Sequence, residues 1–247
     1  MNCKNCGNTL SGSYCTSCGQ KAKTSRFDWQ YLGKQILDSV DFDRGFFHTL
    51  YSLLRRPGNA INGYINGKRI GFTNPFRLFL IVGALTNFLT YEFDTFSLLK
   101  AEDIIAADLP EIQSYFKYSS RYFSFFSLVG VPLFSFFTWI LYKKAGYNFI
   151  EHFILNMYIA IGQFLLMIVF VPIIDLGGSI LFIQIYGTFN FLYNIWVLVT
   201  FFKWNRKSFL AGILSVGLPS TIIPYYGYVV YRLSPQALWE LLDQILT

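Results

Sequence analysis

Four cysteines lie within the first eighteen residues of the chain, and no other cysteine follows them. They form two CxxC units, CKNCG and CTSCG, separated by eight residues. Each CxxC places two thiolates about one turn apart on one ion, and the following glycine permits the positive φ that such a knuckle needs. The spacing therefore predicts a tetrahedral structural zinc site, Zn²⁺ held by Cys3, Cys6, Cys15 and Cys18.

Two other uses of these cysteines are a pair of disulfides and a redox CxxC. Stable disulfides are disfavoured in a reducing cytoplasm, where the topology below places this segment. A redox CxxC usually occurs once, beside a βαβ pattern that is absent from this sequence. A closed shell of four thiolates leaves no position for a substrate, so the metal is expected to stabilise a small fold rather than to catalyse a reaction.

The composition indicates an integral membrane protein. The chain is 53% hydrophobic and 14% charged, with a mean hydropathy of +0.40, whereas a soluble domain has about 25% charged residues. No cleaved signal sequence is expected, because the first long apolar run begins only near Phe76. Five stretches are apolar enough to cross a bilayer, namely 75–92, 121–142, 153–174, 180–202 and 209–231.

Basic residues predict the orientation of these spans. Residues 1–72 hold ten Lys or Arg against four Asp or Glu. Further basic residues follow the second span (Lys143, Lys144) and the fourth (Lys203, Arg206, Lys207), whereas the loop 94–120 is acidic. By the positive-inside rule, the amino terminus is cytoplasmic and the carboxyl terminus external.

The predicted fold class is an all-α membrane protein with five transmembrane helices, a small N-terminal zinc ribbon and interfacial amphipathic helices. The expected domains are a zinc ribbon (1–24), cytoplasmic amphipathic helices (25–74), the transmembrane domain (75–232) and an external amphipathic helix (233–247). No internal repeat at a fixed period is expected.

Two amphipathic helices are predicted between the cysteines and the first span. The apolar face of the first helix has Trp29, Leu32, Ile36, Leu37 and Val40. The second helix follows Asp43, its expected N-cap, and its apolar face has Phe47, Leu50, Tyr51 and Leu54. Such helices lie in the headgroup layer or cover the cytoplasmic end of the bundle, and the pattern leaves both open. Pro57 can start a further helix.

Basic side chains near the membrane entrance are candidates for binding lipid phosphates or an acidic partner: Lys68, Arg69, Arg77, Arg55 and Arg56. The alternative is that they act only as the topology signal. His48 and His152 are predicted at the cytoplasmic interface, where they are candidates for a second metal site. Their sequence context has no recognisable ligand spacing, and the alternative is amphipathic packing.

Polar residues inside the spans are amides and hydroxyls rather than charges, which argues against a proton-coupled pump. The candidates for an intramembrane site are Gln163, Asn190, Asn194 and Ser220. Hydrogen bonding between helices explains such residues equally well and is the favoured interpretation. In the fifth span, Pro219 and Pro224 predict a kinked or broken helix.

The order CKNCG, YCTSCGQ, VDFDRGFFHTL and RRPGNAINGYINGKRIGFTNPFRLFL resembles an uncharacterised bacterial family of membrane proteins with an N-terminal zinc ribbon, a domain of unknown function. The resemblance covers roughly the first third of the chain and implies a bacterial inner-membrane location, without an activity.

We expect a non-enzymatic multi-pass protein whose cytoplasmic ribbon docks to a larger membrane protein complex, such as a translocation or secretion machine, with contacts to membrane lipids. Docking to nucleic acid or the ribosome is a weaker variant. The alternative function is a transporter or lipid flippase that uses the midplane polar residues and the broken fifth helix.

Overall fold

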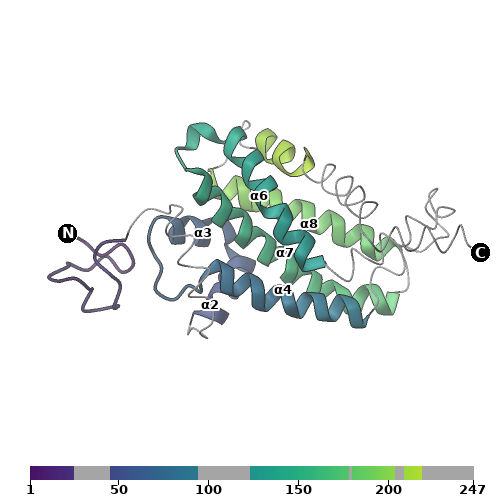
Figure 1. The fold of residues 1–247 in the computed structure, drawn as a ribbon, viewed down its shortest axis with the longest axis horizontal. Coiled ribbons are helices and arrows are strands. Elements are labelled where there is room, and N and C mark those ends of the chain that lie inside the picture. Colours follow the sequence, from purple (N-terminus) through teal and green to yellow (C-terminus); the bar gives the residue numbers. More distant parts are fainter. Residues whose placement is uncertain (25–44, 94–122, 178–179, 204–208, 219–247) are drawn as a thin grey trace, which may run out of the picture.

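The computed structural model describes residues 1–24, 45–93, 123–177, 180–203 and 209–218 (Figure 1). Most of them are helical, and they contain no strand beyond two isolated β-bridges near the amino terminus. The helices are α2 (Phe46–Arg55), α3 (Pro57–Ile65), α4 (Pro75–Glu92), α6 (Phe123–Leu141), the short 3-10 helix η2 (Lys143–Ala145), α7 (Phe149–Gly177), α8 (Ile180–Phe201) and the helical residues Phe209–Leu218. The all-α prediction is confirmed for the described part of the chain.

Two helical segments in the described residues are long and apolar enough to cross a membrane, Phe149–Gly177 and Leu181–Phe201. The prediction of five spans is therefore supported only in part. α4 has the predicted bounds but is not one of the two, because Arg77, Asn87 and Glu92 lower its mean hydropathy. The apolar stretches Gly130–Leu141 and Phe209–Leu218 are shorter within the described residues.

Several predicted features lie outside the described residues. They are the amphipathic helix at 29–40, the proline-containing half of the fifth span and the external helix at 233–247. The predicted N-cap Asp43 is wrong, because α2 begins after Gly45 and has no side-chain cap.

Proline sets the start of two helices. Pro57 takes the first position of α3, as predicted, where its missing N–H costs nothing. Pro75 does the same for α4, and the side chain of Asn74 before it accepts a hydrogen bond from the N–H of Phe76 at 2.9 Å. The start of α4 is thus fixed by residues adjacent in the sequence.

A capping box starts α7 at Phe149 rather than at residue 153, where apolar patterning placed the beginning of the third span. The side chain of Asn148 accepts from the N–H of Glu151 at 2.9 Å, and the carboxylate of Glu151 accepts from the N–H of Asn148 at 2.8 Å. Two otherwise unpaired backbone donors are satisfied in this way.

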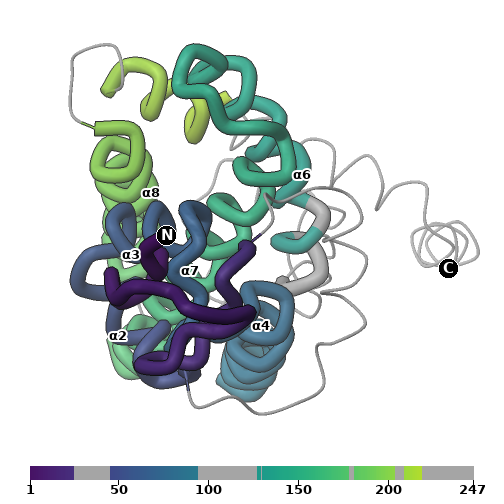
Figure 2. The backbone as a smooth tube through the Cα atoms, turned by 90° about the vertical axis from the view of Figure 1, so that its left-hand side faces the viewer, coloured from purple at the N-terminus to yellow at the C-terminus, as the bar shows by residue number. Residues whose placement is uncertain are grey.

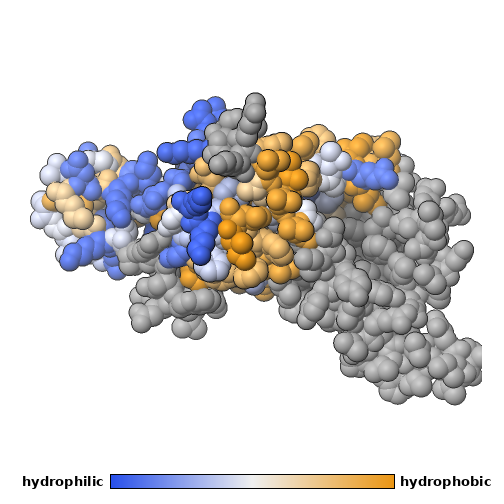
Figure 3. Space-filling model, turned by 90° about the horizontal axis from the view of Figure 1, so that it is seen from above, coloured by the Kyte–Doolittle hydropathy of each residue, from blue (hydrophilic) through white to orange (hydrophobic). Residues whose placement is uncertain are grey.

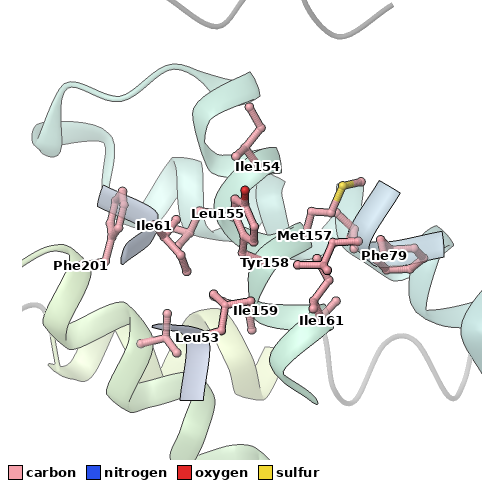
Figure 4. Close-up of a cluster of buried hydrophobic side chains, with 14 of the residues drawn as sticks. Leu53, Ile61, Phe79, Ile154, Leu155, Met157, Tyr158, Ile159, Ile161 and Phe201 are labelled. Carbon is pink, nitrogen blue, oxygen red and sulfur yellow. The ribbon is translucent and has the colours of Figure 1, made fainter. Parts of the chain in front are cut away.

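α7 is the central helix of the bundle and packs against α4, α6 and α8, with α2 and α3 covering its first half (Figures 1 and 2). From Ile150 to Gly162 only Phe153 is not fully buried. Side chains from α2, α3, α4 and α8 meet this part of α7 in one cluster (Figure 4). Each large aliphatic side chain buried there contributes about 1.5–3 kcal/mol, so this cluster holds these five helices together.

α2 buries a different face from the predicted one. Thr49 and Leu53 are buried, whereas three residues of the predicted apolar face are exposed: Phe47 by 78%, Tyr51 by 58% and Leu54 by 49%. Leu50 is half-buried against the core. Thr49 can be buried because its hydroxyl donates to the carbonyl oxygen of Gly45 at 2.8 Å and accepts from the N–H of Thr73 at 2.8 Å.

The segment before α4 is held on both sides at Thr73. Its N–H donates to the hydroxyl of Thr49 on α2, and its carbonyl accepts from the hydroxyl of Tyr158 on α7 at 2.8 Å. Tyr158 is fully buried, so this bond lies in the core cluster. Thr73 thereby connects α2 and α7 just before α4 begins, which positions the loop and the start of α4.

α3 lies very close to the end of α8 because Gly58 has no side chain. A Cβ at that position would collide with the hydroxyl of Thr200 and with the backbone of Phe201. The adjacent helix α2 also contacts α8, because the hydroxyl of Tyr193 on α8 donates to the carbonyl of Leu53 on α2 at 3.3 Å. The pair α2 and α3 is thus fixed against the same end of the bundle as the start of α7.

Candidate metal centre and its surroundings

The four predicted ligands come together in the N-terminal ribbon, which we define as residues 1–24. All four sulfur atoms lie within 4.8 Å of one another. The Sγ atoms of Cys3 and Cys18 are 3.6 Å apart, and those of Cys6 and Cys15 are 3.5 Å apart. Sulfur ligands at about 2.3 Å from one tetrahedral ion lie at comparable distances from each other. The four cysteines could therefore hold a metal ion.

Each CxxC forms the same turn. In the first, the N–H of Gly7 donates to the carbonyl of Cys3 at 2.9 Å; in the second, the N–H of Gly19 donates to that of Cys15 at 2.8 Å. The two glycines have φ of +82° and +75°, as predicted for such knuckles. Side chains other than glycine rarely adopt this conformation, so both glycines are required by the turn.

The two knuckles are copies of one another, which corrects the expectation of no internal repeat. The β-bridge between Asn2 and Thr9 in the first is matched by the bridge between Tyr14 and Lys21 in the second. The strand-like hydrogen bonds that flank each knuckle are also repeated twelve residues later in the chain. The repeat was visible only as the doubled CxxC, because the residues between the cysteines differ.

Backbone donors favour the thiolate form of two of the four cysteines, Cys3 and Cys15. The N–H of Cys6 lowers the pKa of Cys3 to about 6, and the N–H of Cys18 lowers the pKa of Cys15. At Cys6 the N–H of Asn8 lowers the pKa, but burial and the neighbouring sulfur atoms outweigh it and raise the pKa to about 12. Several thiolates so close together need a cation between them, which fits a divalent ion with sulfur ligands.

Gln20 fastens the ribbon to the rest of the protein, a role that the sequence did not reveal. Its side-chain Nε2 donates to the carbonyl of Gly67 at 2.6 Å, and its Oε1 accepts from the N–H of Arg69 at 3.1 Å. The side chain is only 3% exposed. Gln20 occupies the position after the second knuckle that Asn8 occupies after the first. The repeat is therefore the sequence signal that could have drawn attention to Gln20.

The loop that receives Gln20 is shaped for close contact. Gly67 has φ +104°, and a Cβ there would come within 3.0 Å of Thr24 and of Lys4, both in the ribbon. A cavity of about 540 Å³ lies beside this contact. It is lined by residues of the ribbon, by Arg69 and others of this loop, by the turn before α7 and by Glu151 in the first turn of α7. The ribbon therefore lies against the end of the bundle, as Figures 1 and 2 show.

The basic candidates do not form one cluster. Arg55 and Arg56 are exposed where α2 ends and α3 begins. Lys68 is exposed and Arg69 half-buried in the loop that contacts the ribbon, and Arg77 is half-buried in the first turn of α4. They share one end of the bundle, and hydrophilic residues gather over that end and the ribbon (Figure 3).

Further basic residues lie at the same end. η2 includes Lys143 and Lys144, and Lys203 follows α8. The rings of Tyr142, next to η2, and Phe202, next to the end of α8, stack with centroids 3.9 Å apart. The end of α6 and the end of α8 are thus adjacent, which brings basic segments far apart in the sequence to one side of the bundle.

Three of the four intramembrane candidates are connected by hydrogen bonds. The Nε2 of Gln163 on α7 donates to the Oδ1 of Asn190 on α8 at 3.1 Å, and the Nδ2 of Asn194 donates to the same oxygen at 3.0 Å. Asn190 in turn donates to the hydroxyl of Tyr186 at 3.0 Å. The arrangement joins two helices, as the favoured interpretation expected. Ser220 lies outside the described residues.

His152 is buried inside the bundle rather than exposed at its surface. It is 1% exposed, between α6 and α7, with its Nδ1 3.1 Å from the hydroxyl of Thr138. Asn156 donates to the same hydroxyl at 2.9 Å. The capping box extends α7 toward the ribbon, which places His152 inside the bundle. His48 instead donates from Nδ1 to the carbonyl of Gly71 at 2.8 Å. Among the described residues, the four cysteines are the group of His, Cys, Asp and Glu that could hold a metal.

Residues 43–86 match a protein family described as Protein of unknown function (DUF3667). No curated protein and no solved structure matches the chain. The matched segment includes α2, α3, the loop that receives Gln20 and the first two thirds of α4. The resemblance to a family of unknown function is confirmed for this segment, which contains the surface that contacts the ribbon but not the ribbon itself.

Proposed function

We propose that this chain is a multi-pass protein of a bacterial inner membrane, with five spanning helices and a cytoplasmic N-terminal ribbon that holds a structural Zn²⁺. In this proposal the ribbon and the loop beneath it form a non-enzymatic docking surface for a larger membrane protein assembly, such as a translocation or secretion machine. The carboxyl terminus is external.

The observation that carries the proposal is the attachment of the ribbon. Gln20 binds the backbone at both Gly67 and Arg69, so the ribbon has a fixed orientation at the end of the bundle. A ribbon that served only to bind a metal would not need a buried attachment of this kind. A docking surface benefits from a fixed orientation, because binding a partner then costs no conformational entropy for ordering the ribbon.

The outer side of the ribbon suits a protein partner. Met1 is 80% exposed and Tyr14 is 56% exposed, although both are large and apolar. Exposed tyrosine and methionine are enriched in protein interfaces. Lys4, Lys21 and Lys23 also lie in the ribbon, and they keep nucleic acid or the ribosome as a weaker variant. Four thiolates on one Zn²⁺ carry a net negative charge that reduces this attraction.

The membrane topology in this proposal is supported by the gathering of basic residues at the end of the bundle that bears the ribbon. Lysines and arginines near membrane segments remain on the cytoplasmic side. The exposed apolar side chains of α4 and α8, such as Leu80, Leu85, Phe88 and Leu192, fit a lipid environment. Phe149–Gly177 and Leu181–Phe201 supply the two clearest spans.

The metal is tested by measuring zinc in the purified full-length protein. We expect one Zn²⁺ per chain, and Cys15→Ser should lower it to less than about a tenth, because a structural site with three thiolates binds far more weakly. Ser17→Ala, in the same knuckle but not a ligand, is the control and should keep the metal. A wild-type protein without a metal would contradict the zinc assignment.

The docking role is tested by a photocrosslinking residue placed at Tyr14 in intact membranes. A defined membrane-protein adduct is expected there, and it should disappear in the Cys15→Ser background. The same crosslinker at Phe136, an exposed position on α6, should give no such adduct. Adducts that are absent, or that do not depend on the cysteines, would refute docking through the ribbon, and a ribonuclease-sensitive adduct would favour the RNA variant.

A transporter or lipid flippase remains the alternative. In that case Gln163 and Asn190 would have to exchange their mutual hydrogen bond for a substrate. Their present bonds instead favour a packing role. Alanine at either position should abolish transport without lowering abundance if the alternative holds, and should merely destabilise the protein if it does not.

A further inference from the structure

A groove of about 550 Å³ lies where α2 meets α3, at the end of the bundle that bears the ribbon. Its size is within the range of about 300–1,000 Å³ that is usual for small-ligand clefts. His48, Tyr51, Ser52 and Arg55 line it from one side of α2, and the other lining residues are Arg56, Asn59, Ala60 and Phe72. None of these lining residues is acidic.

Two guanidinium groups give the groove its charge. Arg55 and Arg56 are adjacent in the sequence and both are exposed. The Nη1 of Arg55 donates to the hydroxyl of Tyr51 at 2.6 Å, and a guanidinium has four further N–H donors. Guanidinium groups bind phosphate through paired, charge-assisted hydrogen bonds.

The backbone adds to this preference. α3 begins directly after Arg56, and no side chain caps its first turn. The N–H groups and the positive end of the helix dipole at such a terminus attract an anion. Asn59 in that first turn lines the groove, so the guanidiniums and the helix terminus act on the same space.

An apolar edge borders the groove. Phe47 and Leu54 are exposed on α2, and Tyr51 both belongs to this edge and lines the groove. A helix with large apolar side chains next to arginines is typical of the layer where headgroups meet acyl chains. A soluble phosphate compound would have no use for this apolar edge, whereas a lipid has both a phosphate and a chain.

The position of the groove agrees with such a ligand. α3 lies against the end of α8 at Gly58, and α2 is bonded to α8 through Tyr193 and Leu53. The groove is therefore beside the end of a segment long enough to cross a membrane. A lipid in the adjacent leaflet would present its headgroup at this level.

The geometry points to a binding site for the phosphate headgroup of an anionic phospholipid, with Arg55 and Arg56 on the phosphate and Phe47 and Leu54 against the acyl chains. The site rests on the membrane location in the proposed function but not on the metal or on a docking partner. A ribbon without zinc or without a protein partner would leave it standing.

Native mass spectrometry of the delipidated full-length protein tests the site, with phosphatidylglycerol and phosphatidylcholine as probes. The wild type should bind one phosphatidylglycerol more tightly than phosphatidylcholine by about thirtyfold, the preference that two basic residues near an anionic lipid give. In the double variant Arg55→Gln and Arg56→Gln this preference should disappear.

The control is the double variant Lys143→Gln and Lys144→Gln, which removes the same charge from exposed positions at the same end of the bundle and should keep the preference. Equal losses in both double variants would overturn the site in favour of a general charge effect. Displacement of the lipid by inorganic phosphate, or by an acidic peptide at the same concentration, would overturn the assignment to a lipid.

Discussion

Replacing Gln20 with alanine should release the ribbon from the bundle while leaving its metal site intact. The substitution removes the hydrogen bonds to the carbonyl of Gly67 and from the N–H of Arg69, both formed by a buried side chain. Each bond contributes about 1 kcal/mol net. The loss of both, about 2 kcal/mol, corresponds to about a thirtyfold increase in the population of the detached state.

Hydrogen exchange of the purified, metal-loaded protein measures this population. The amide of Arg69 should exchange about thirtyfold faster in Gln20→Ala, provided that exchange occurs from the detached state. Core amides of α7 should be unaffected, because the core cluster does not include Gln20. The zinc content should stay at the wild-type value, since Gln20 is not a ligand.

Asn8→Ala is the matched control. Asn8 occupies the position in the first knuckle that Gln20 occupies in the second, but its side chain donates only to the exposed hydroxyl of Ser17 at 2.7 Å. It should leave the exchange of Arg69 unchanged. If Gln20→Ala also left it unchanged, or if Asn8→Ala accelerated it equally, the attachment would not depend on Gln20.

Two further predictions concern the packing of the bundle. Gly58→Ala should lower the free energy of unfolding by about 1–3 kcal/mol, because the new Cβ overlaps α8. The control is Gly63→Ala in the same helix, where a Cβ meets only ordinary contacts, and this variant should be neutral or stabilising. Equal thermal stability of the two variants would contradict the close approach of α3 to α8. Asn190→Ala should destabilise the protein by about 0.6 kcal/mol per hydrogen bond lost. The measurement is the thermal midpoint of unfolding in detergent, which should fall only slightly. A fall as large as that caused by truncating a core side chain would contradict a role limited to these hydrogen bonds.

Local signals in the sequence were sufficient where the structure depends on neighbours in the chain. The CxxC spacing gave the four ligands, and the glycine after each unit gave the positive φ. Pro57 and Pro75 gave the starts of α3 and α4. The glycine turns and the helix starts depend on interactions within about four residues, and even the cysteine cluster joins residues no more than fifteen apart, so the pattern of residue types contains nearly all the information.

Patterning identified the apolar face of α2 but not the face that this helix buries against the bundle. On α2 it indicated the face with Phe47, Tyr51 and Leu54, whereas the buried face has Thr49 and Leu53. The hydroxyl of Thr49 finds partners only after the chain has folded back at Thr73. A polar residue looks exposed in a sequence until its partner is known.

The sequence by itself determined which four cysteines could hold a metal, the helical class, the basic end and the bounds of several helices. Only the tertiary structure decided that Gln20 attaches the ribbon to a loop nearly fifty residues away, that His152 is buried, and that Arg55 and Arg56 share a groove with an exposed apolar edge. Those outcomes depend on which surfaces meet. Residues distant in the chain meet because the helices pack around α7 to bury the core, and close packing fixes how they are arranged.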